Sequence, residues 1–154
     1  TLTGLPNRRM FEQRLAQALA MAKRTGHLCA LLFVDLDDFK AINDALGHAA
    51  GDTVLKAVAW TTTQTVRESD TVARLAGDEF TVLCENLDAP EQAAQIAAKL
   101  EQALAQPLDF NGQVQPIRAS VGFALFPRDA ADAGGLMAAA DAAMYRAKQR
   151  NRGA

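Results

Sequence analysis

The 154-residue sequence contains few of the residues that mark disulfide-rich, zinc-binding or membrane proteins. Its two cysteines lie inside apolar runs, and with only two histidines at irregular spacing they form no zinc site, so we expect buried, reduced thiols. No apolar run approaches the roughly 20 residues of a membrane span, and no signal peptide is recognisable. The net charge of −2 gives no general attraction to nucleic acid or acidic membranes. We therefore expect a cytoplasmic domain that neither binds nucleic acid nor inserts into a membrane, although the full-length protein could be membrane-anchored.

The spacing of apolar residues predicts alternating helices and strands within one domain. Apolar residues make up 49% of the chain and charged residues 22%, which is typical of a soluble globular protein. Helical spacing, caps and glycine or proline stops predict helices over residues 7–24, 38–46, 52–67, 89–107 and 132–150. Apolar runs and turns predict strands over 28–35, 71–75, 80–84, near 108, and over 114–125, with an Asn111-Gly112 hairpin joining the last two. This order predicts an α+β fold in which helices cover a mostly antiparallel sheet of about five strands.

Three carboxylates next to apolar strands are the strongest candidates for chemistry. Asp35 ends a predicted buried strand, and Asp78 and Glu79 lie in a glycine turn between two others. A carboxylate beside partly buried surface is costly unless paired, and a hard divalent cation such as Mg²⁺ removes that cost. Two such ions about 3.5–4 Å apart can clamp the attacking and leaving oxygens of an in-line displacement. The pattern predicts a two-metal phosphoryl-transfer site; the simpler alternatives are a helix cap at Asp35 and a solvated turn at Asp78-Glu79.

Other residues suit a bound nucleotide. The turn before the predicted helix 38–46 exposes N–H groups that can hold phosphates. Asn43 and Asp52 suit guanine, because a carboxylate accepts from its N1 and N2 donors and an amide complements the remaining edge. Lys148 and Arg152, four apart on one helix face, can clamp phosphates. The alternatives are that Asn43 and Asp52 cap or start helices, and that Lys148 and Arg152 are ordinary cations at a helix C-terminus.

Together these segments resemble the GGDEF domain of diguanylate cyclases over residues 1–154. Seven motifs in the family's order make the resemblance specific. They are Leu2 to Arg9, Val34 to Asp37 with Phe39-Lys40 and Ile42 to Asp44, Gly47-His48 with Gly51-Asp52, Ala76 to Phe80, Ala119 to Gly122, Ala140-Asp141 with Met144-Tyr145, and Ala147-Lys148. The resemblance implies a palm-like α+β fold, related to the ferredoxin-like fold. It also implies condensation of two GTP into cyclic di-GMP with release of two pyrophosphates.

The resemblance assigns a role to each matching residue. Asp35, Asp78 and the Leu36 carbonyl would bind two Mg²⁺ or Mn²⁺ ions per active site, with Glu79 beside them. Either Asp78 or Glu79 would take the proton from the ribose 3′-hydroxyl. The remaining candidates are expected to contact the nucleotide: Asn43 and Asp52 at guanine, Asp38, Phe39, Lys40, Lys148 and Arg152 at the β- and γ-phosphates, and His48, for which a packing or surface role is the simpler explanation.

Arg67 and Asp70 have the Arg-x-x-Asp form at the position where the family places its product-inhibition site. Arginine can bind the O6 and N7 edge of guanine, and aspartate can accept from N1 and N2. The alternative is a cation at a helix end followed by an acid in a turn. The segment 91–106 offers only Lys99 as a further cation for the far side of this site.

Three departures from the family pattern are visible. Ala76 replaces the first signature glycine, Asn151 stands where glycine usually precedes the last arginine, and the acid that normally precedes Leu2 is absent. We expect a domain excised from a larger multidomain protein, with a fused sensor or phosphodiesterase domain and a homodimer needed for turnover. The alternatives are a weak or inactive module that binds GTP or cyclic di-GMP and regulates an attached domain, and an adenylyl cyclase or polymerase-like enzyme.

Overall fold

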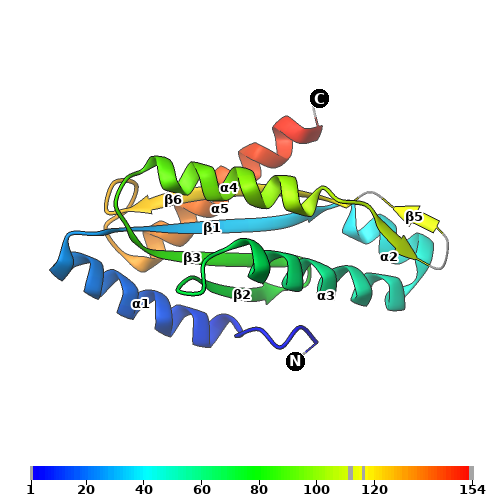
Figure 1. Cartoon of the computed structure of the whole chain (residues 1–154), viewed down its shortest axis with the longest axis horizontal. Coiled ribbons are helices and arrows are strands. Elements are labelled where there is room, and N and C mark those ends of the chain that lie inside the picture. The colour runs from blue at the N-terminus through cyan, green and yellow to red at the C-terminus, as the bar shows by residue number, and fades with distance from the viewer. Residues whose placement is uncertain (1, 111–112, 116, 153–154) are drawn as a thin grey trace.

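The central strand of the fold is β1 (Leu28–Asp37), which has a paired neighbour on each side. A computed structural model describes residues 2–110, 113–115 and 117–152. β1 pairs antiparallel with β3 (Glu79–Leu87) and β6 (Arg118–Phe126), and β2 (Thr71–Ala76) pairs with β3, giving the order β2-β3-β1-β6 (Figure 1). The antiparallel α+β fold is confirmed, although this sheet has four strands rather than about five.

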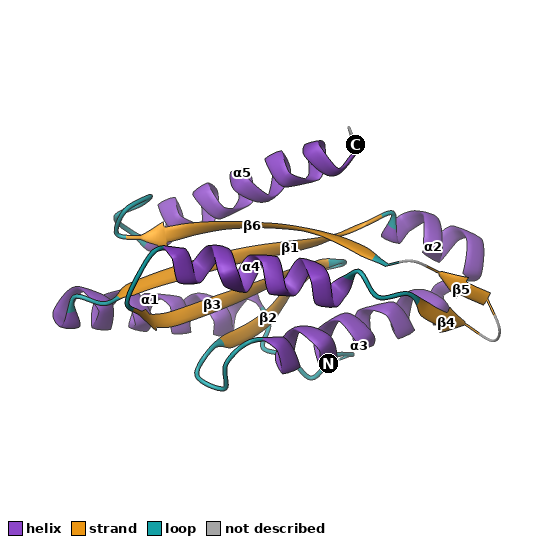
Figure 2. Cartoon of the chain, turned by 45° about the horizontal axis from the view of Figure 1, so that its top comes forward, coloured by secondary structure: helices purple, strands orange, loops and turns teal. Residues whose placement is uncertain are grey.

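Helices cover both faces of the sheet because the side chains of β1 alternate between two apolar cores. One core contains Ala30, Leu32, Val34 and Leu36 with side chains of α3 (His48–Thr65) and α4 (Glu91–Leu104). The other contains Cys29, Leu31 and Phe33 with side chains of α1 (Arg8–Thr25) and α5 (Ala133–Arg152). Figure 2 shows α4 and α5 on opposite sides of β6. The prediction of a strand buried on both faces is confirmed.

The first helix follows its sequence signals closely. The Asn7 side chain accepts a hydrogen bond from the Met10 N–H at 3.0 Å, which satisfies a free donor at the N-terminus of α1. Gly26 ends the helix with φ of 77°, a left-handed conformation that suits glycine. These caps place α1 as predicted.

The third helix begins earlier than predicted. α2 (Phe39–Leu46) ends at Gly47, and α3 starts at once with His48, four residues before Asp52. Gly51 does not break the helix. It lies where α3 passes α2, and a Cβ there would collide with the side chain of Asn43. The prediction that Asp52 starts or caps a helix was therefore wrong, because this glycine provides close packing rather than a helix stop.

The single strand predicted over 114–125 is divided. β4 (Leu108–Phe110) and β5 (Gln113–Gln115) form a separate two-stranded sheet, and β6 begins only at Arg118. The sequence has proline at position 116, which has no N–H to donate to a continuous ladder. The predicted Asn111-Gly112 turn lies outside the described residues.

Close approach of α5 to the sheet depends on Gly122 in β6. A Cβ at this position would collide with the backbone of Ala143 and Met144.

Both cysteines are free and buried, and burial raises the pKa of the Cys29 thiol to about 11. None of the helices in the described part of the chain is long and apolar enough to cross a membrane.

Candidate active site

Asp35 occupies a position inside β1 rather than at its end. β1 continues to Asp37, and Asp35 lies opposite Glu79 in β3 and Ser120 in β6. The predicted strand end and the alternative helix cap are both wrong. The strand tolerates the charge because the Lys148 ammonium of α5 reaches Asp35 Oδ2 at 2.7 Å and Asp37 Oδ1 at 3.9 Å.

The β2–β3 hairpin brings two further carboxylates to the same place. Cross-strand partners on adjacent strands share a face of the sheet, so Glu79 and Asp35 point the same way. Asp78 lies in the turn just before Glu79, after Gly77, whose φ of 49° favours glycine. The Arg74 Nε donates to the Gly77 carbonyl at 2.8 Å and fastens the turn.

Ala76 fits the hairpin without strain. It lies in β2 opposite Glu79 and is not among the residues with positive φ. Alanine in place of the first signature glycine is therefore a mild change, because only a left-handed conformation would have penalised the Cβ.

Burial and mutual charge repulsion both act on the converging carboxylates. Burial and the charge of Asp35 raise the pKa of Asp78, while Lys148 lowers it. Burial, the charge of Asp35 and that of Asp141 likewise raise the pKa of Glu79. Each raised pKa means that the folded protein disfavours the ionised acid, so a bound cation would be stabilised at this position.

The side chains of Asp35, Asp78 and Glu79 have the chemistry to bind a hard divalent ion. All three side chains offer carboxylate oxygens, the ligands that Mg²⁺ prefers. As they stand, the described His, Cys, Asp and Glu side chains form no group of three that could hold a metal ion. Instead, the positive charge of the Lys148 ammonium compensates the negative charge of Asp35. Asp35 is the acid whose charge raises the pKa of both Asp78 and Glu79. The Leu36 side chain is buried in the core with α3 and α4 and has no donor atom, so this residue could contribute only its backbone carbonyl.

Most of the predicted nucleotide residues lie in the turn after β1 and in α2 and α3. Asp38 has a φ of 60° and no side-chain cap bond, and it makes the turn into α2, which begins with Phe39 and the exposed Lys40. Asn43 lies against Gly51, the residue before the exposed Asp52, so the two residues of the proposed guanine pair come from adjacent helices. His48 is exposed at the start of α3.

Lys148 contacts the carboxylates rather than standing apart as a helix-end cation. The Arg152 backbone belongs to α5, but its side chain lies outside the described residues. Of the predicted lysine–arginine clamp, only the lysine side chain is described, and the phosphate-binding role of both residues stays a prediction.

A supporting network near Asp37 was not predicted. The Ser120 hydroxyl donates to Asp37 Oδ1 at 3.0 Å, and the Asn151 side chain donates to the Ser120 oxygen at 3.1 Å. The sequence could have indicated that Asp37 lies near the site, because Asp35 and Asp37 are two residues apart and residues two apart in a strand share a face. Asn151, which replaces the usual glycine of the family pattern, therefore makes a hydrogen bond to Ser120.

Comparisons with known proteins identify the family. A family model described as "Diguanylate cyclase, GGDEF domain" matches residues 1–154. This chain belongs to the GGDEF family. The prediction made from the motif series is confirmed.

Curated relatives of this GGDEF domain include two from Pseudomonas aeruginosa. The chain is 47% identical over 151 residues to the bifunctional diguanylate cyclase/cyclic di-GMP phosphodiesterase MucR, covering 98% of this chain and 22% of that protein. It is 45% identical to the diguanylate cyclase TpbB, covering 99% of this chain and 35% of TpbB. The chain thus spans between about a fifth and a third of the length of these relatives.

Solved structures give the same fold. The GGDEF domain of TpbB superposes with a TM-score of 0.93 at 44% identity, covering 96% of this chain and 92% of that one. The GGDEF domain of DgcB from Caulobacter crescentus, in complex with c-di-GMP, has a TM-score of 0.88 at 30% identity, covering 97% and 88%. Both are GGDEF domains, which agrees with the palm-like prediction.

The Arg67–Asp70 pair of this GGDEF domain is internally bonded. Arg67 donates from Nε to Asp70 Oδ2 at 3.2 Å and from Nη2 to Asp70 Oδ1 at 2.8 Å and the Glu85 carbonyl at 2.6 Å. The side-chain hydrogen bond to Asp70 raises the pKa of Arg67. A cavity of about 200 Å³ beside it is lined by Arg67 and Lys99, among others. The pair is a structural ion pair next to a cavity, and its use by a ligand stays a prediction.

Proposed function

We propose that this GGDEF domain is an active diguanylate cyclase, which condenses two GTP into cyclic di-GMP and releases two pyrophosphates. The observation that supports this most directly is the register of the sheet. It brings Asp35 opposite Glu79, next to Asp78 in the hairpin turn. The three acids proposed for a two-metal site therefore come from neighbouring positions of β1 and of the β2–β3 hairpin.

In the proposed mechanism, each side chain binds, orients or moves a proton. Two Mg²⁺ or Mn²⁺ ions, held by Asp35, Asp78, Glu79 and the Leu36 carbonyl, would supply charge neutralisation at the attacking and leaving oxygens. Asp78 or Glu79, with its raised pKa, accepts the proton of the ribose 3′-hydroxyl. Positioning provides most of the acceleration in phosphoryl transfer, so the remaining residues act mainly by orienting the nucleotide.

Nucleotide binding requires Lys148 to change partners. Its ammonium now bonds to Asp35 at 2.7 Å, and it would have to leave this carboxylate to meet the β- or γ-phosphate. Residues 38–40 would hold the same phosphates from the turn into α2, together with Arg152. His48 would lie beside them.

Product analysis after incubation with GTP and Mg²⁺ is the decisive experiment. We expect cyclic di-GMP and pyrophosphate in a 1:2 ratio, identified by mass spectrometry, and no cyclic product from ATP. Binding of GTP without any product would instead favour a regulatory module that controls an attached domain. That second function is suggested by another relative, 39% identical over 148 residues, which is named cyclic di-GMP phosphodiesterase NbdA.

Specific activity should fall steeply on dilution. The product is twofold symmetric, while one chain carries one set of nucleotide residues, so two domains must each bring one GTP. We expect activity per mole of protein to drop over a hundredfold dilution series. A flat profile, with monomers confirmed by light scattering, would contradict the proposed homodimer.

Asp52→Ala should mainly weaken the preference for GTP. Loss of the acceptor for the guanine N1 and N2 donors leaves those donors unpaired, at a cost of about 1–3 kcal/mol that ATP does not incur. The ratio of kcat/KM for GTP and ATP is the measurement. The matched control is Asp44→Ala, which also removes one exposed acid, in this case from α2 rather than α3. Equal losses for both nucleotides in the Asp52 variant would remove it from the guanine site.

Cyclic di-GMP should inhibit by binding at Arg67 and Asp70 without competing with GTP. Arg67→Ala removes a bidentate guanine contact worth about 1–3 kcal/mol, so calorimetry should give weaker product binding while the initial rate is kept. The Asp70 side chain is 0% exposed beneath Arg67, so the ligand must displace part of the present ion pair. Glu68→Ala, in the same turn, should bind the product normally. Unchanged affinity in the Arg67 variant would leave this arginine as a structural residue.

We further propose that the full-length protein carries a fused sensor or phosphodiesterase domain. MucR is named as a bifunctional protein with both activities, and this chain matches 22% of its length. The input signal to the domain would come from such an attached part.

A further inference from the structure

The outer edge of β6 takes no part in the proposed cyclisation site. β6 is the last strand in the sheet order, and no other strand among the described residues pairs with its outer side. Leu125 lies opposite Ala30 of β1, yet its N–H donates to Asp129 Oδ2 at 2.8 Å and its carbonyl accepts from the Asp129 N–H at 2.7 Å. The backbone groups of Leu125 therefore point away from β1.

The same direction holds for every second residue of the strand. In an antiparallel pair, residues alternate between bonding to the partner strand and pointing away from it. Val121 and Phe123 have the same parity as Leu125, so their N–H and carbonyl groups also face outward. Asp129 occupies only the end of this edge, and the rest offers alternating donors and acceptors.

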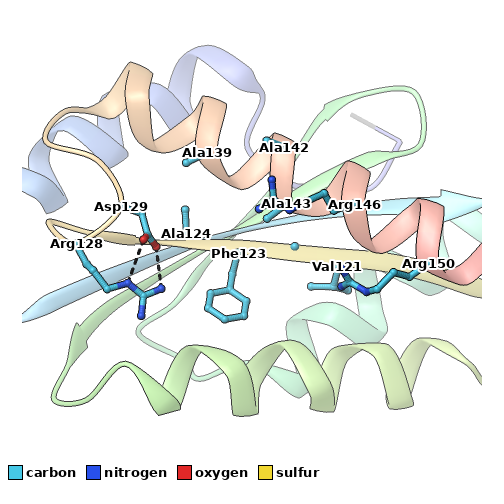
Figure 3. A pocket seen from close by; sticks show the side chains of 11 residues that line it. Val121, Phe123, Ala124, Arg128, Asp129, Ala139, Ala142, Ala143, Arg146 and Arg150 are labelled. Atoms are coloured by element: carbon cyan, nitrogen blue, oxygen red, sulfur yellow. Dashed lines mark hydrogen bonds and ion pairs between the residues drawn. The ribbon is translucent and has the colours of Figure 1, made fainter.

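A groove runs beside these backbone groups. It is a cavity of about 510 Å³ lined by residues 121–124 of β6 and by α5, as Figure 3 shows. The α5 side presents Ala139, Ala142 and Ala143, whose small side chains leave room next to the strand. The groove follows four consecutive residues of β6, from Val121 to Ala124.

Positive charge lines the groove. Arg146 and Arg150 are exposed on α5, and the salt bridges of the described residues include neither of them, whereas Arg128 is paired with Asp129 at 3.0 Å. Residues four apart on a helix are about 6 Å apart along its axis. Alternate residues of an extended strand are about 6.8 Å apart, so carboxylates at every second position would match this arginine pair.

We propose that the outer edge of β6 accepts an extended, acidic segment of a partner protein, which adds to the sheet as a further strand. Main-chain hydrogen bonds to Val121 and Phe123 provide affinity, and acidic side chains at alternate positions pair with Arg146 and Arg150. A free phosphate fits less well, because it cannot satisfy the outward carbonyls. Arginine along an edge also discourages pairing between copies of one protein, so that simpler role must be separated by experiment.

The test uses an eight-residue peptide that alternates glutamate and valine, labelled for fluorescence anisotropy and added to the 154-residue chain. We expect saturable binding, with slowed amide hydrogen exchange at Val121 and Phe123. Arg146→Glu and Arg150→Glu should each weaken binding at least tenfold, while Arg24→Glu on α1 should not. A peptide with lysine for glutamate, or with N-methyl groups on the face that meets β6, should fail to bind.

Three results would overturn the proposal. One is the absence of binding at millimolar peptide; another is equal binding of the lysine or N-methylated peptide. The third is full competition by inorganic pyrophosphate without protection of Val121 and Phe123, which would indicate a site for anions only. If the peptide fails to bind while Arg146→Ala makes the chain self-associate in light scattering, the arginines serve to block edge pairing. None of these outcomes depends on cyclase activity.

Discussion

Asp78→Asn should abolish cyclic di-GMP formation while leaving the domain at least as stable as before. Substitutions in the partners of metal ligands already cost about 10–100-fold in metal affinity or activity, so loss of a ligand itself should exceed 100-fold. Stability should not fall, because burial and the charge of Asp35 raise the pKa of Asp78 and thereby disfavour its ionised form in the fold. The neutral amide keeps the shape and removes that repulsion.

Initial rates at saturating Mg²⁺ and thermal unfolding of the same samples measure both halves of this prediction. Asp35→Asn should lose activity equally, but it should also lower Tm because Lys148 loses its 2.7 Å partner. Asp88→Asn, an exposed acid at the other end of the sheet, is the matched control and should change neither quantity. Near-normal turnover in either site variant would remove the two-metal assignment.

Gly122→Ala should destabilise the domain by about 3 kcal/mol, at the upper end of the usual cost of overpacking. The added Cβ would collide with the backbone of Ala143 and Met144, which cannot rotate away as a side chain can. Relief requires α5 to move off β6, and this movement carries Lys148 away from Asp35. We therefore expect a loss of unfolding free energy in urea together with a loss of activity.

Gly134→Ala provides the control for this substitution, since it also adds one methyl group, at a glycine of α5. The nearest atom to the new Cβ is Asp132 Oδ1 at 3.8 Å, an ordinary contact. Replacing glycine in a helix without strain stabilises by about 0.4–1 kcal/mol. Similar stability changes at both positions would mean that the approach of α5 to β6 is adjustable.

Local signals in the sequence were sufficient to predict α1 and the central strand. Asn7 and Gly26 mark the ends of the helix with side-chain and backbone chemistry that acts within a few residues. The run from Leu28 is apolar at consecutive positions because both of its faces are buried. The hairpin at Gly77 was predicted for the same reason, since the turn depends on the conformational freedom of one residue.

Features that depend on distant contacts were missed. Gly51 resembles a helix stop until Asn43 of the neighbouring helix is placed against it. Asp35 resembles the end of a strand because its stabilising partner, Lys148, is 113 residues away in the sequence. The pairing of Ser120 with Asp37 and Asn151 likewise joins three segments that have no local relation. The motif series identified the family, but the partners of each acid required the structure.

The position of Asp35 within the central strand also favours the correct register of the sheet during folding. Side chains alternate with a period of two, so a shift of β1 by one residue against β3 would exchange its two faces. Asp35 and Asp37 would then lie among the apolar side chains of α3 and α4, without Lys148. A misaligned sheet would therefore bury two uncompensated charges. The residues proposed for catalysis thus raise the free energy of any fold in which the register of β1 is wrong.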